Sequence, residues 1–527
     1  MKVLSILLVI LVTCDQIANG YRILGLFPLH GPSHWVMMQP LMKGLAQRGH
    51  QVDVVSHFPQ KKSIPNYTDI SILGSMHATR NNISAAEAST FSGFSMAHLT
   101  DMAGTQICEL LSHPAIQNLI KNPPQDPPYD ILITEVFMAP CFLAFGRHLK
   151  IPIVATVTSV FHDWLNELSG NVANPSFIPG LFSTYGQHMN FEERLLNFLM
   201  SHMISAQIHY YTSFQVEYVK KHFGIKDASI MDLYGDISLY LVNSHPALHG
   251  IRPYTSAIVE VGGLHVKDDV DPLSPEVQKW LDESTNGCVY FTFGSMVRIE
   301  TFPKELIEAF YMSFKKIAPV RVLMKVAKKE DLLPGLPSNV MTQSWFPQIA
   351  VLKHKNVRAF ITHGGLMGTQ EAINYEVPMI GIPLFGDQSV NIKSYVKKKV
   401  AISLNSIKNV TEEKLTSALN SILNDPTYRE NVRKLSKLFR DRPMSALDTA
   451  IYWVEYVGRH GNFLQSPAIQ LHWWQRHLLD VYAFLLFVIV AVLLVVLFIL
   501  RKLKRLLFGS HVCTKKDSAA IKSKKNK

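Results

Sequence analysis

The chain contains little cysteine, with five among 527 residues, which excludes a small fold held together mainly by disulfides. Charged residues are also sparse at 18%, whereas apolar residues make up 47%. Such a composition supports large buried cores and excludes disorder along most of the chain. At about 100–200 residues per domain, the length predicts two or three domains.

The central part of the chain lacks an excess of either charge. The formal net charge is +11, but residues 501–527 hold ten basic residues against one acidic residue. Residues 21–500 carry 41 basic and 39 acidic groups. A body that binds nucleic acid usually presents a basic surface, so this balance disfavours a nucleic-acid partner.

The two ends of the chain predict its membrane topology. Residues 1–20 read as a secretory signal peptide, with Lys2 before an apolar run and Ala18-Asn19-Gly20 as a small-x-small cleavage site. Residues 481–500 carry no charge, and as a helix they would span about 30 Å, the thickness of a bilayer core. The basic tail at 501–527 predicts a cytosolic C-terminus. We therefore expect a single-pass type I membrane protein with a lumenal or extracellular body.

The chain also carries signals of compartment and modification. It ends Lys524-Lys525-Asn526-Lys527, which resembles the dilysine retrieval signal of endoplasmic reticulum membrane proteins and predicts that membrane as its location. Three triplets match the N-glycosylation pattern, at Asn66, Asn82 and Asn409.

The cysteines of the body do not suggest a metal. Cys108, Cys141 and Cys288 remain once the signal peptide and the tail are set aside, an odd number without metal-ligand spacing. We predict no structural zinc.

The body shows two α/β halves. Tyr21–Pro28 and Val52–Val55 read as strands on either side of a helix, and Cys288–Phe293 starts a second alternation that continues with a helix at Pro303–Ile317. Two Rossmann-like domains of this kind would face each other across a cleft, because open parallel sheets bind ligands beyond the carboxyl ends of their strands. The expected boundaries are 21–265 for the first domain, 280–440 for the second, and 441–480 for C-terminal helices that approach the membrane.

One stretch of the first half, at about 190–223, is helical in pattern and rich in aromatic residues. Packing helices are the favoured interpretation. The weaker alternative is a face that touches membrane or an apolar substrate.

Residues 345–391 carry the chemistry. Ala359–Thr362 reads as a strand, His363-Gly364-Gly365 as the turn after it, and Thr369–Asn374 as the start of a helix. Glycines in such a turn let backbone N–H groups approach an anion, which the N-terminus of the helix also favours. The segment therefore predicts a phosphate site.

The whole of this segment resembles the donor signature of the UDP-glycosyltransferases, the animal membrane-bound family that includes the glucuronosyltransferases. The resemblance covers nearly the full chain, and includes Ser33-His34-Trp35 after the first strand and Phe293-Gly294-Ser295 at the start of the second domain. It implies the two-domain GT-B fold and a UDP-sugar donor.

The resemblance also implies roles for individual donor-site residues. Trp345 would stack on uracil and Gln348 would bond the base or ribose edge. Glu371 would accept from the ribose hydroxyls, and Asp387 and Gln388 would hold the sugar. The diphosphate would meet Ser295, His363 and N–H groups near Gly365, Gly368 and Thr369. Met367 and Lys325 depart from the residues expected in relatives. The UDP-sugar is a co-substrate, so we expect no cofactor and no metal.

The acceptor hydroxyl must lose a proton, and a histidine with a pKa near neutral suits that task. His34 matches the catalytic base of the family. An acid should orient its imidazole. The matching position holds Glu135, and Asp130 is the competing candidate.

The sequence thus predicts transfer of a hexose to a hydroxyl of a small lipophilic acceptor by inverting displacement, in detoxification or conjugation. Glucose is favoured over glucuronate because the Gly-Thr-Gln-Glu-Ala run looks like insect members of the family. The alternatives are a UDP-glucuronate donor, a lipid acceptor, and a catalytically silent membrane protein that binds nucleotide sugar or acts as a chaperone. A homo- or hetero-oligomer is compatible with the sequence.

Overall fold

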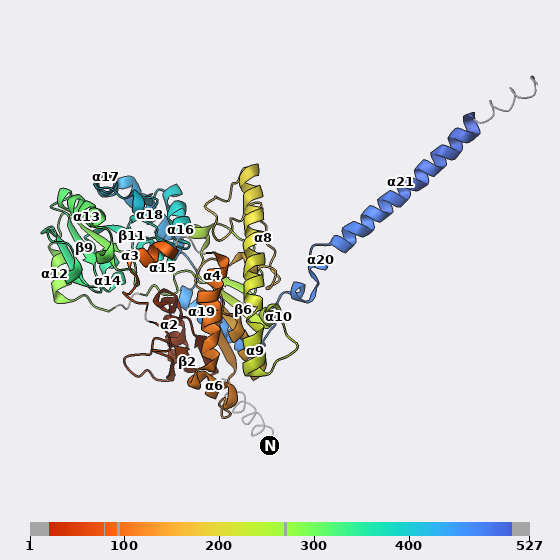
Figure 1. The fold of residues 1–527 in the computed structure, drawn as a ribbon, viewed down its shortest axis with the longest axis horizontal. Helices are drawn as coiled ribbons and strands as arrows, with labels where there is room; N and C mark the ends of the chain where they lie inside the picture. Colours follow the sequence, from red (N-terminus) through yellow and green to blue (C-terminus); the bar gives the residue numbers. More distant parts are fainter. Residues whose placement is uncertain (1–19, 78, 92–94, 268–270, 509–527) are drawn as a thin grey trace, which may run out of the picture. The chain divides into compact units, whose positions relative to one another are not determined.

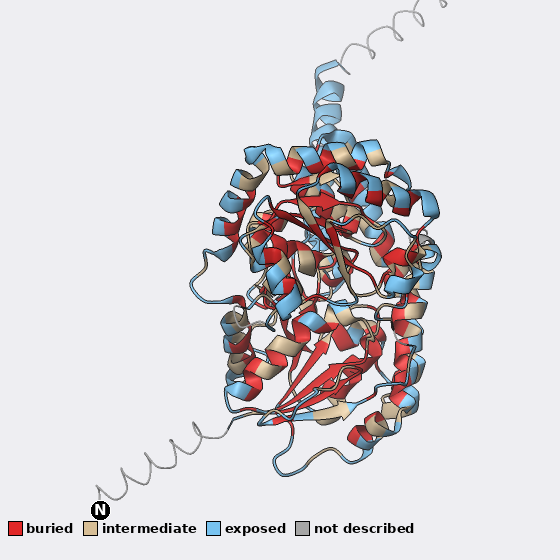
Figure 2. Ribbon diagram, turned by 90° about the vertical axis from the view of Figure 1, so that its left-hand side faces the viewer, coloured by how far each residue is buried: buried red, intermediate tan, exposed pale blue. Residues whose placement is uncertain are grey.

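The computed structural model describes residues 20–77, 79–91, 95–267 and 271–508. Two parallel β-sheets form the centres of two Rossmann-like domains, and helices surround both (Figures 1 and 2). This architecture confirms the predicted α/β fold class. The predicted signal peptide, apart from Gly20, and the tail with Lys524 and Lys525 lie outside the described residues.

The first sheet has seven parallel strands in the order β3-β2-β1-β4-β5-β6-β7. Alternate residues of a strand enter two separate cores, as when Ile131 and Ile133 enter one core and Leu132 enters the other. Because β1 pairs with β4, the carboxyl ends of these two strands are neighbours. The strands are β1 (Arg22–Phe27), β2 (Gln51–Ser56), β3 (Tyr67–Ser71), β4 (Ile131–Glu135), β5 (Ile153–Val157), β6 (Ile237–Val242) and β7 (Ile258–Glu260).

Helices between these strands cover the first sheet. The longest, α8, runs along one flank of the domain (Figure 1). The helices between these strands are α2 (Pro32–Gln47), α3 (Ala85–Phe91), α4 (Met96–Thr100), α5 (Gln106–Cys108), α6 (Pro114–Lys121), α7 (Ala144–Leu149), α8 (Phe191–Ser213), α9 (Val216–Phe223), α10 (Ile230–Tyr234) and α11 (Pro246–His249). Of these, α3 is the exception, because its Ala88 packs in the core of the second domain.

The second sheet has six parallel strands in the order β10-β9-β8-β11-β12-β13. The strands are β8 (Cys288–Thr292), β9 (Arg321–Lys325), β10 (Val340–Gln343), β11 (Val357–Thr362), β12 (Met379–Gly381) and β13 (Ala401–Ser403). The helices are α12 (Pro275–Asp282), α13 (Lys304–Lys316), α14 (Gln348–Lys353), α15 (Leu366–Asn374), α16 (Gln388–Lys397), α17 (Glu412–Asn424) and α18 (Pro426–Arg440).

Two segments cross between the domains. A crossing segment (residues 79–88) leaves the first domain and packs on the second, where Ile83 and Ala88 join the second core and Ile83 forms a β-bridge with Val297. In the other direction, α19 (Ala446–His460) returns from the second domain, and its Ile451 packs in one core with residues of α2. The two domains are therefore joined by packing as well as by the chain.

Residues 467–508 form a separate unit with two helices, α20 (Trp473–Arg476) and α21 (Leu479–Phe508). The predicted span at 481–500 lies within α21. By length and composition α21 could cross a membrane, with a mean hydropathy of 3.6 over its most apolar window.

The structure assigns a disulfide that the sequence left unpredicted. Cys108, at the end of α5, is bonded to Cys141, which follows β4, whereas Cys288 is free and buried in β8. Within the described ranges, no group of three or more His, Cys, Asp or Glu residues could hold a metal ion. Asn66, Asn82 and Asn409 are all exposed, and their glycosylation stays a prediction.

Candidate functional site

His34 lies at the carboxyl end of β1. Gly31 and Pro32 begin α2 after the loop, so His34 falls in the first turn of this helix, with its N–H donating to Gly31 O at 3.1 Å. Pro32 suits this position because the first N–H groups of a helix have no partner within the helix. The imidazole is thereby fixed at the edge of the sheet where parallel strands present ligand-binding residues.

The imidazole of His34 is held by two residues at the carboxyl ends of β4 and β5. Glu135 ends β4, and its Oε1 lies 2.6 Å from His34 Nδ1. Thr158 follows β5, donates to the same Oε1 at 2.8 Å and lies 3.1 Å from Nδ1. A carboxylate this close requires the imidazole proton on Nδ1, which leaves Nε2 with its lone pair free to accept a proton.

The other candidate acid, Asp130, lies at the opposite end of β4. Its Oδ2 accepts from the backbone N–H of Arg22 at 2.8 Å. The hydrogen-bond partner of His34 is therefore Glu135. Sequence reasoning missed Thr158, although a hydroxyl residue directly after the buried strand Ile153–Val157 was the available signal.

The electrostatic environment of His34 favours the protonated imidazole. Burial by itself lowers the pKa of His34, but the charge and hydrogen bond of Glu135, with the charge of Asp387, raise it above its usual value. The side chain is 26% exposed, so a substrate could reach it, whereas that of Glu135 is only 7% exposed. Nearby, burial and then the His34 charge lower the pKa of His162 to about 3. Of these two histidines, His34 is thus the one whose pKa is raised and that can hold a proton.

His363 follows β11 in the second domain and lies in a slot between two glycines. A Cβ on Gly294 or on Gly365 would come within 2.8 Å or 2.7 Å of the His363 ring, so larger residues would close this slot. Burial, and then the cation of Lys325, lower the pKa of His363 to about 4. Its Nδ1 is buried without a hydrogen-bond partner. A neutral imidazole with an unsatisfied nitrogen fits a residue expected to meet a diphosphate oxygen.

The helix after this turn begins earlier than expected, at Leu366 instead of Thr369. The Thr369 N–H donates to Gly365 O at 3.1 Å and its hydroxyl donates to Leu366 O at 2.9 Å, so neither group faces an anion. The N–H groups that the first turn leaves for a phosphate belong to residues 366–368. Of the three predicted N–H positions, the geometry favours Gly368 over Thr369.

Glu371 is buried in the middle of α15 and is already partnered. Gln348 Nε2 donates to its Oε2 at 2.6 Å, and His265 Nε2 lies 3.4 Å from its Oε1. Two residues that were predicted to hold the ribose and the base are thus in direct contact. His265, from the end of the first domain, was not predicted.

Asp387 and Gln388 begin α16. Burial raises the pKa of Asp387, against the opposing effects of a hydrogen bond from Asn391 and of the His34 charge. Asp387 therefore acts electrostatically on His34 although the two residues belong to different domains. Gln388 Oε1 accepts from the N–H groups of Leu384 and Phe385 at 2.8 and 3.0 Å, so only its amide nitrogen remains for a sugar hydroxyl.

Trp345 is 46% exposed and carries the guanidinium of Arg80 over its ring, 3.9 Å from the centroid. Lys325 Nζ lies 5.8 Å from the same centroid and donates to Asn81 Oδ1 at 2.6 Å. Burial and the Arg80 charge lower the pKa of Lys325 to about 8, opposed by Glu300. The crossing segment also reaches Ser295, whose carbonyl accepts from the Asn81 N–H at 2.9 Å. The first domain thus contributes the cation of Arg80 to the neighbourhood of the predicted uracil platform, beside Lys325 of the second domain.

Met367 accounts for one departure noted in the sequence. Its sulfur lies 3.1 Å from Asn243 Nδ2 and its carbonyl lies 3.2 Å from His265 Nε2. Both partners belong to the first domain, so Met367 contacts the facing domain.

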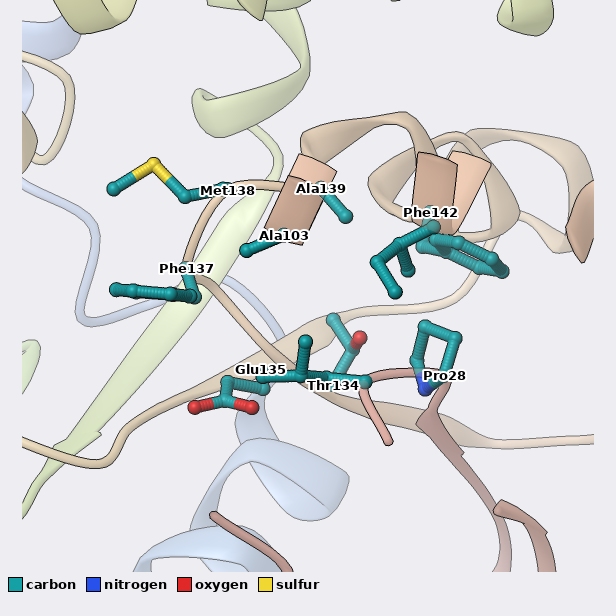
Figure 3. A pocket seen from close by; sticks show the side chains of 10 residues that line it. Pro28, Ala103, Thr134, Glu135, Phe137, Met138, Ala139 and Phe142 are labelled. Carbon is teal, nitrogen blue, oxygen red and sulfur yellow. The ribbon is translucent and has the colours of Figure 1, made fainter. Parts of the chain in front are cut away.

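An apolar hollow lies beside Glu135, as Figure 3 shows. Its walls include Phe137, Met138 and Phe142. The Phe137 ring lies 5.4 Å from the His34 ring and 5.9 Å from the His162 ring. A larger cavity of about 240 Å³ lies between α8 and the loop after β5, and Trp164, which stacks on His162, lines it. The surroundings of His34 in the first domain are therefore aromatic and apolar.

These observations define a two-domain protein of the GT-B glycosyltransferase class, with its candidate site where the carboxyl ends of both sheets meet. The fold resembles that of the glycosyltransferase VinC solved with DTDP, with a TM-score of 0.55 over 84% of this chain and 100% of that chain at 16% identity. The glycotransferase of kitacinnamycin gives a TM-score of 0.51 over 84% of this chain and 98% of that chain at 17% identity.

The chain belongs to the family described as UDP-glucoronosyl and UDP-glucosyl transferase, whose model matches residues 26–517. It is 37% identical to UDP-glucosyltransferase 2 of Dactylopius coccus over 92% of this chain and 94% of that protein. It is 31% identical to human UDP-glucuronosyltransferase 1A6 over 94% of this chain and 93% of that protein. The chain is therefore a UDP-glycosyltransferase, and the family resemblance inferred from its motifs is confirmed.

Proposed function

We propose that this enzyme transfers glucose from UDP-glucose to a hydroxyl of a small lipophilic acceptor by a single inverting displacement. The arrangement of His34, Glu135 and Asp387 carries this proposal, because it provides a base in the first domain that interacts electrostatically with Asp387 of the predicted sugar site in the second. The name of the similar UDP-glucosyltransferase 2 of Dactylopius coccus supports glucose. The apolar walls beside Glu135 support a lipophilic acceptor and a role in conjugation or detoxification.

The proton would move to His34 Nε2. Glu135 fixes Nδ1 as the protonated nitrogen, so Nε2 accepts the proton of the acceptor hydroxyl while the oxygen attacks the anomeric carbon. Glu135 and Asp387 then stabilise the imidazolium that forms. The bond from the anomeric carbon to the UDP oxygen breaks as the new bond forms on the opposite face, which inverts the configuration.

The leaving UDP gains negative charge, and the second domain offers groups to stabilise it. The unpartnered Nδ1 of His363 and the first N–H groups of α15 lie in one turn. Lys325 adds a buried cation nearby, and Ser295 lies in the turn that follows β8. Preorganised donors of this kind stabilise charge that develops during the reaction.

We also propose that the body lies in the lumen of the endoplasmic reticulum, with α21 as the membrane span. The disulfide between Cys108 and Cys141 supports this orientation, because such bonds persist in oxidising compartments. The basic composition of residues 501–527 supports a cytosolic tail.

Replacing Glu135 with Gln should change both the rate and its pH dependence. A base acts only when unprotonated, so activity falls as the pH drops through the pKa of His34. Glu135→Gln removes interactions that raise this pKa and leaves burial, which lowers it, so the acidic limb of kcat/KM should move to lower pH. We expect kcat on the plateau to fall about 10- to 100-fold, which corresponds to losing one charged hydrogen bond.

Asp130→Asn is the matched control for this variant. Asp130 directly precedes the same strand, and its carboxylate accepts from the Arg22 N–H, far from His34 along the strand. Its pH profile should equal that of the wild type. A Glu135→Gln enzyme with an unshifted acidic limb would show that the carboxylate does not set the pKa of the base.

Replacing Trp345 with Ala should weaken UDP binding. Stacking of a base on an aromatic ring contributes about 1–3 kcal/mol, which corresponds to about 5- to 150-fold in Kd. Trp280→Ala is the matched control, because an arginine, Arg321, also covers that ring at 4.5 Å in the same domain. Calorimetric titration with UDP should separate the two variants, and equal affinities would remove Trp345 from the base site.

The donor and the acceptor can be tested together. The enzyme in microsomes would be given UDP-glucose or UDP-glucuronate with a panel of phenols, steroids and flavonoids. We expect glucosides and little glucuronide. Exclusive glucuronide formation would reverse the donor assignment, and transfer to none of the acceptors would favour the catalytically silent interpretation.

A further inference from the structure

The outward face of α8 is apolar along most of its length. Among the described residues between 20 and 466, twenty large apolar side chains are exposed, and nine of them lie on α8 or directly after it, each with at least 41% of its surface exposed. They are Phe191, Leu195, Leu196, Phe198, Leu199, Met200, Met203, Tyr210 and Phe214. We call these residues the α8 stripe. Most of them recur at spacings of three or four residues, which places them on one side of the helix.

Packing within the body does not account for the stripe. The side of α8 that meets the first domain is formed by other residues, Asn197, Ile204, Ile208 and Thr212, which are buried. A helix on the surface of a soluble domain normally presents polar residues outward, and a contiguous apolar patch marks an interaction site. The stripe therefore calls for a partner with an apolar surface.

The chain itself provides such a partner through its C-terminal tether. The last residues of the body are fixed to the elements that support α8. Gln465 donates to the carbonyl of Gly235, just after α10, and Ser466 donates to the carbonyl of Gly170. Both α10 and the helical turn Asp163–Leu165 contact α8.

The tether that follows is short. Residues 467–478 can span at most about 40 Å when fully extended. They lead directly into α21, which at 30 residues is about 45 Å long and apolar enough to cross a bilayer. A bilayer that contains α21 must therefore lie within this reach of the point where the chain leaves the body, which is close to α8.

We propose that the α8 stripe docks into the lipid bilayer that α21 spans, so that the enzyme has two membrane attachments. The helix would lie in the interface with its apolar side chains among the acyl chains. Charges on and after the helix have both signs, with Glu192 and Glu193 near its start and Lys220 and Lys221 on α9. Insertion of apolar side chains is therefore the attraction, and anionic lipids are not required.

The contact can be measured with a fluorescent label on the full-length protein in phosphatidylcholine nanodiscs. Cys513 of the tail would first be changed to Ser, and the cysteines of the body should not take the label because they are buried or disulfide-bonded. A Leu199→Cys variant would carry an environment-sensitive dye on the stripe. The matched control is Leu438→Cys on α18 of the second domain, since Leu438 exposes 62% of its surface against 52% for Leu199.

Lipids with a quencher on the acyl chain should quench the Leu199 label several-fold more than the Leu438 label. Iodide in the buffer should show the reverse order. Equal quenching of both labels by the lipid would overturn the proposal. Energy transfer between two labelled copies without lipid quenching would also overturn it, because a second copy of the chain would then cover the stripe.

A double variant tests whether the apolar side chains of the α8 stripe hold it in the bilayer. Leu196→Glu with Met203→Glu places two charges on exposed sites, where substitutions usually change stability little. With the label kept at residue 199, lipid quenching should fall to the level of the Leu438 control. The Kd for UDP should stay unchanged, because neither residue lies near the donor site. Undiminished lipid quenching in this variant would contradict insertion of the stripe.

Discussion

His34→Ala should abolish sugar transfer and leave UDP-glucose binding intact. General base catalysis typically contributes about 10²–10⁴-fold, and the alternative proton acceptor in this site is water. UDP-glucose affinity should be retained because its expected contacts lie in the second domain, around His363 and Glu371. The measurements are single-turnover transfer to a phenol and calorimetric titration with UDP-glucose.

Two controls show whether the loss of activity is caused by the loss of the base. One is the thermal unfolding of the variant, and the other is the replacement of a second histidine. His98→Ala changes an exposed histidine of the same domain and should keep full activity. Removing the imidazole also takes a partner from the buried Glu135 carboxylate, which keeps the Thr158 hydroxyl, so the unfolding temperature of His34→Ala is measured beside its activity. A His34→Ala enzyme with unchanged kcat would show that another group removes the proton.

Removing the disulfide should produce the largest change in stability. Cys108 and Cys141 are both fully buried, and their bond closes a loop across a sequence separation of 33 residues. Replacing both with Ala should lower the free energy of unfolding by about 2–5 kcal/mol. The measurement is thermal inactivation of the detergent-solubilised enzyme, followed by residual transfer activity.

A reductant supplies the internal control for that experiment. It should lower the inactivation temperature of the wild type to that of the double variant and leave the double variant unchanged. Cys288→Ala is the comparison for a buried cysteine without a partner, and its response to reductant should equal that of the wild type. If the reductant leaves the inactivation temperature of the wild type unchanged, the disulfide between Cys108 and Cys141 is contradicted.

The strands of both domains were largely predictable because parallel strands buried on both faces are continuous apolar runs. Cys288–Thr292 and Val357–Thr362 fall within a residue or two of their predicted limits. The short strands β12 and β13 were not predicted, because three-residue strands carry too little pattern. The return of α19 to the first domain was also missed, since helical spacing shows that a face is apolar and not which sheet it meets.

The site was predictable where one strand end carries one functional residue. His34 and Glu135 could be assigned this way. Choosing between Glu135 and Asp130 required knowing that β4 runs parallel to β1, because this places the carboxyl end of β4 beside the carboxyl end of β1. Contacts between domains were beyond the sequence. His265 beside Glu371 and Arg80 over Trp345 join residues far apart in the chain, and no local pattern indicates them.

The central claim is that His34 deprotonates an acceptor that displaces UDP directly from the sugar. The anomeric configuration of the product tests it most directly. UDP-glucose, an α-linked donor, would be incubated with the enzyme and a simple phenol, and the product examined by proton NMR. A β-glucoside is the predicted result. An α-glucoside would contradict the account, because retention requires a different route through the site.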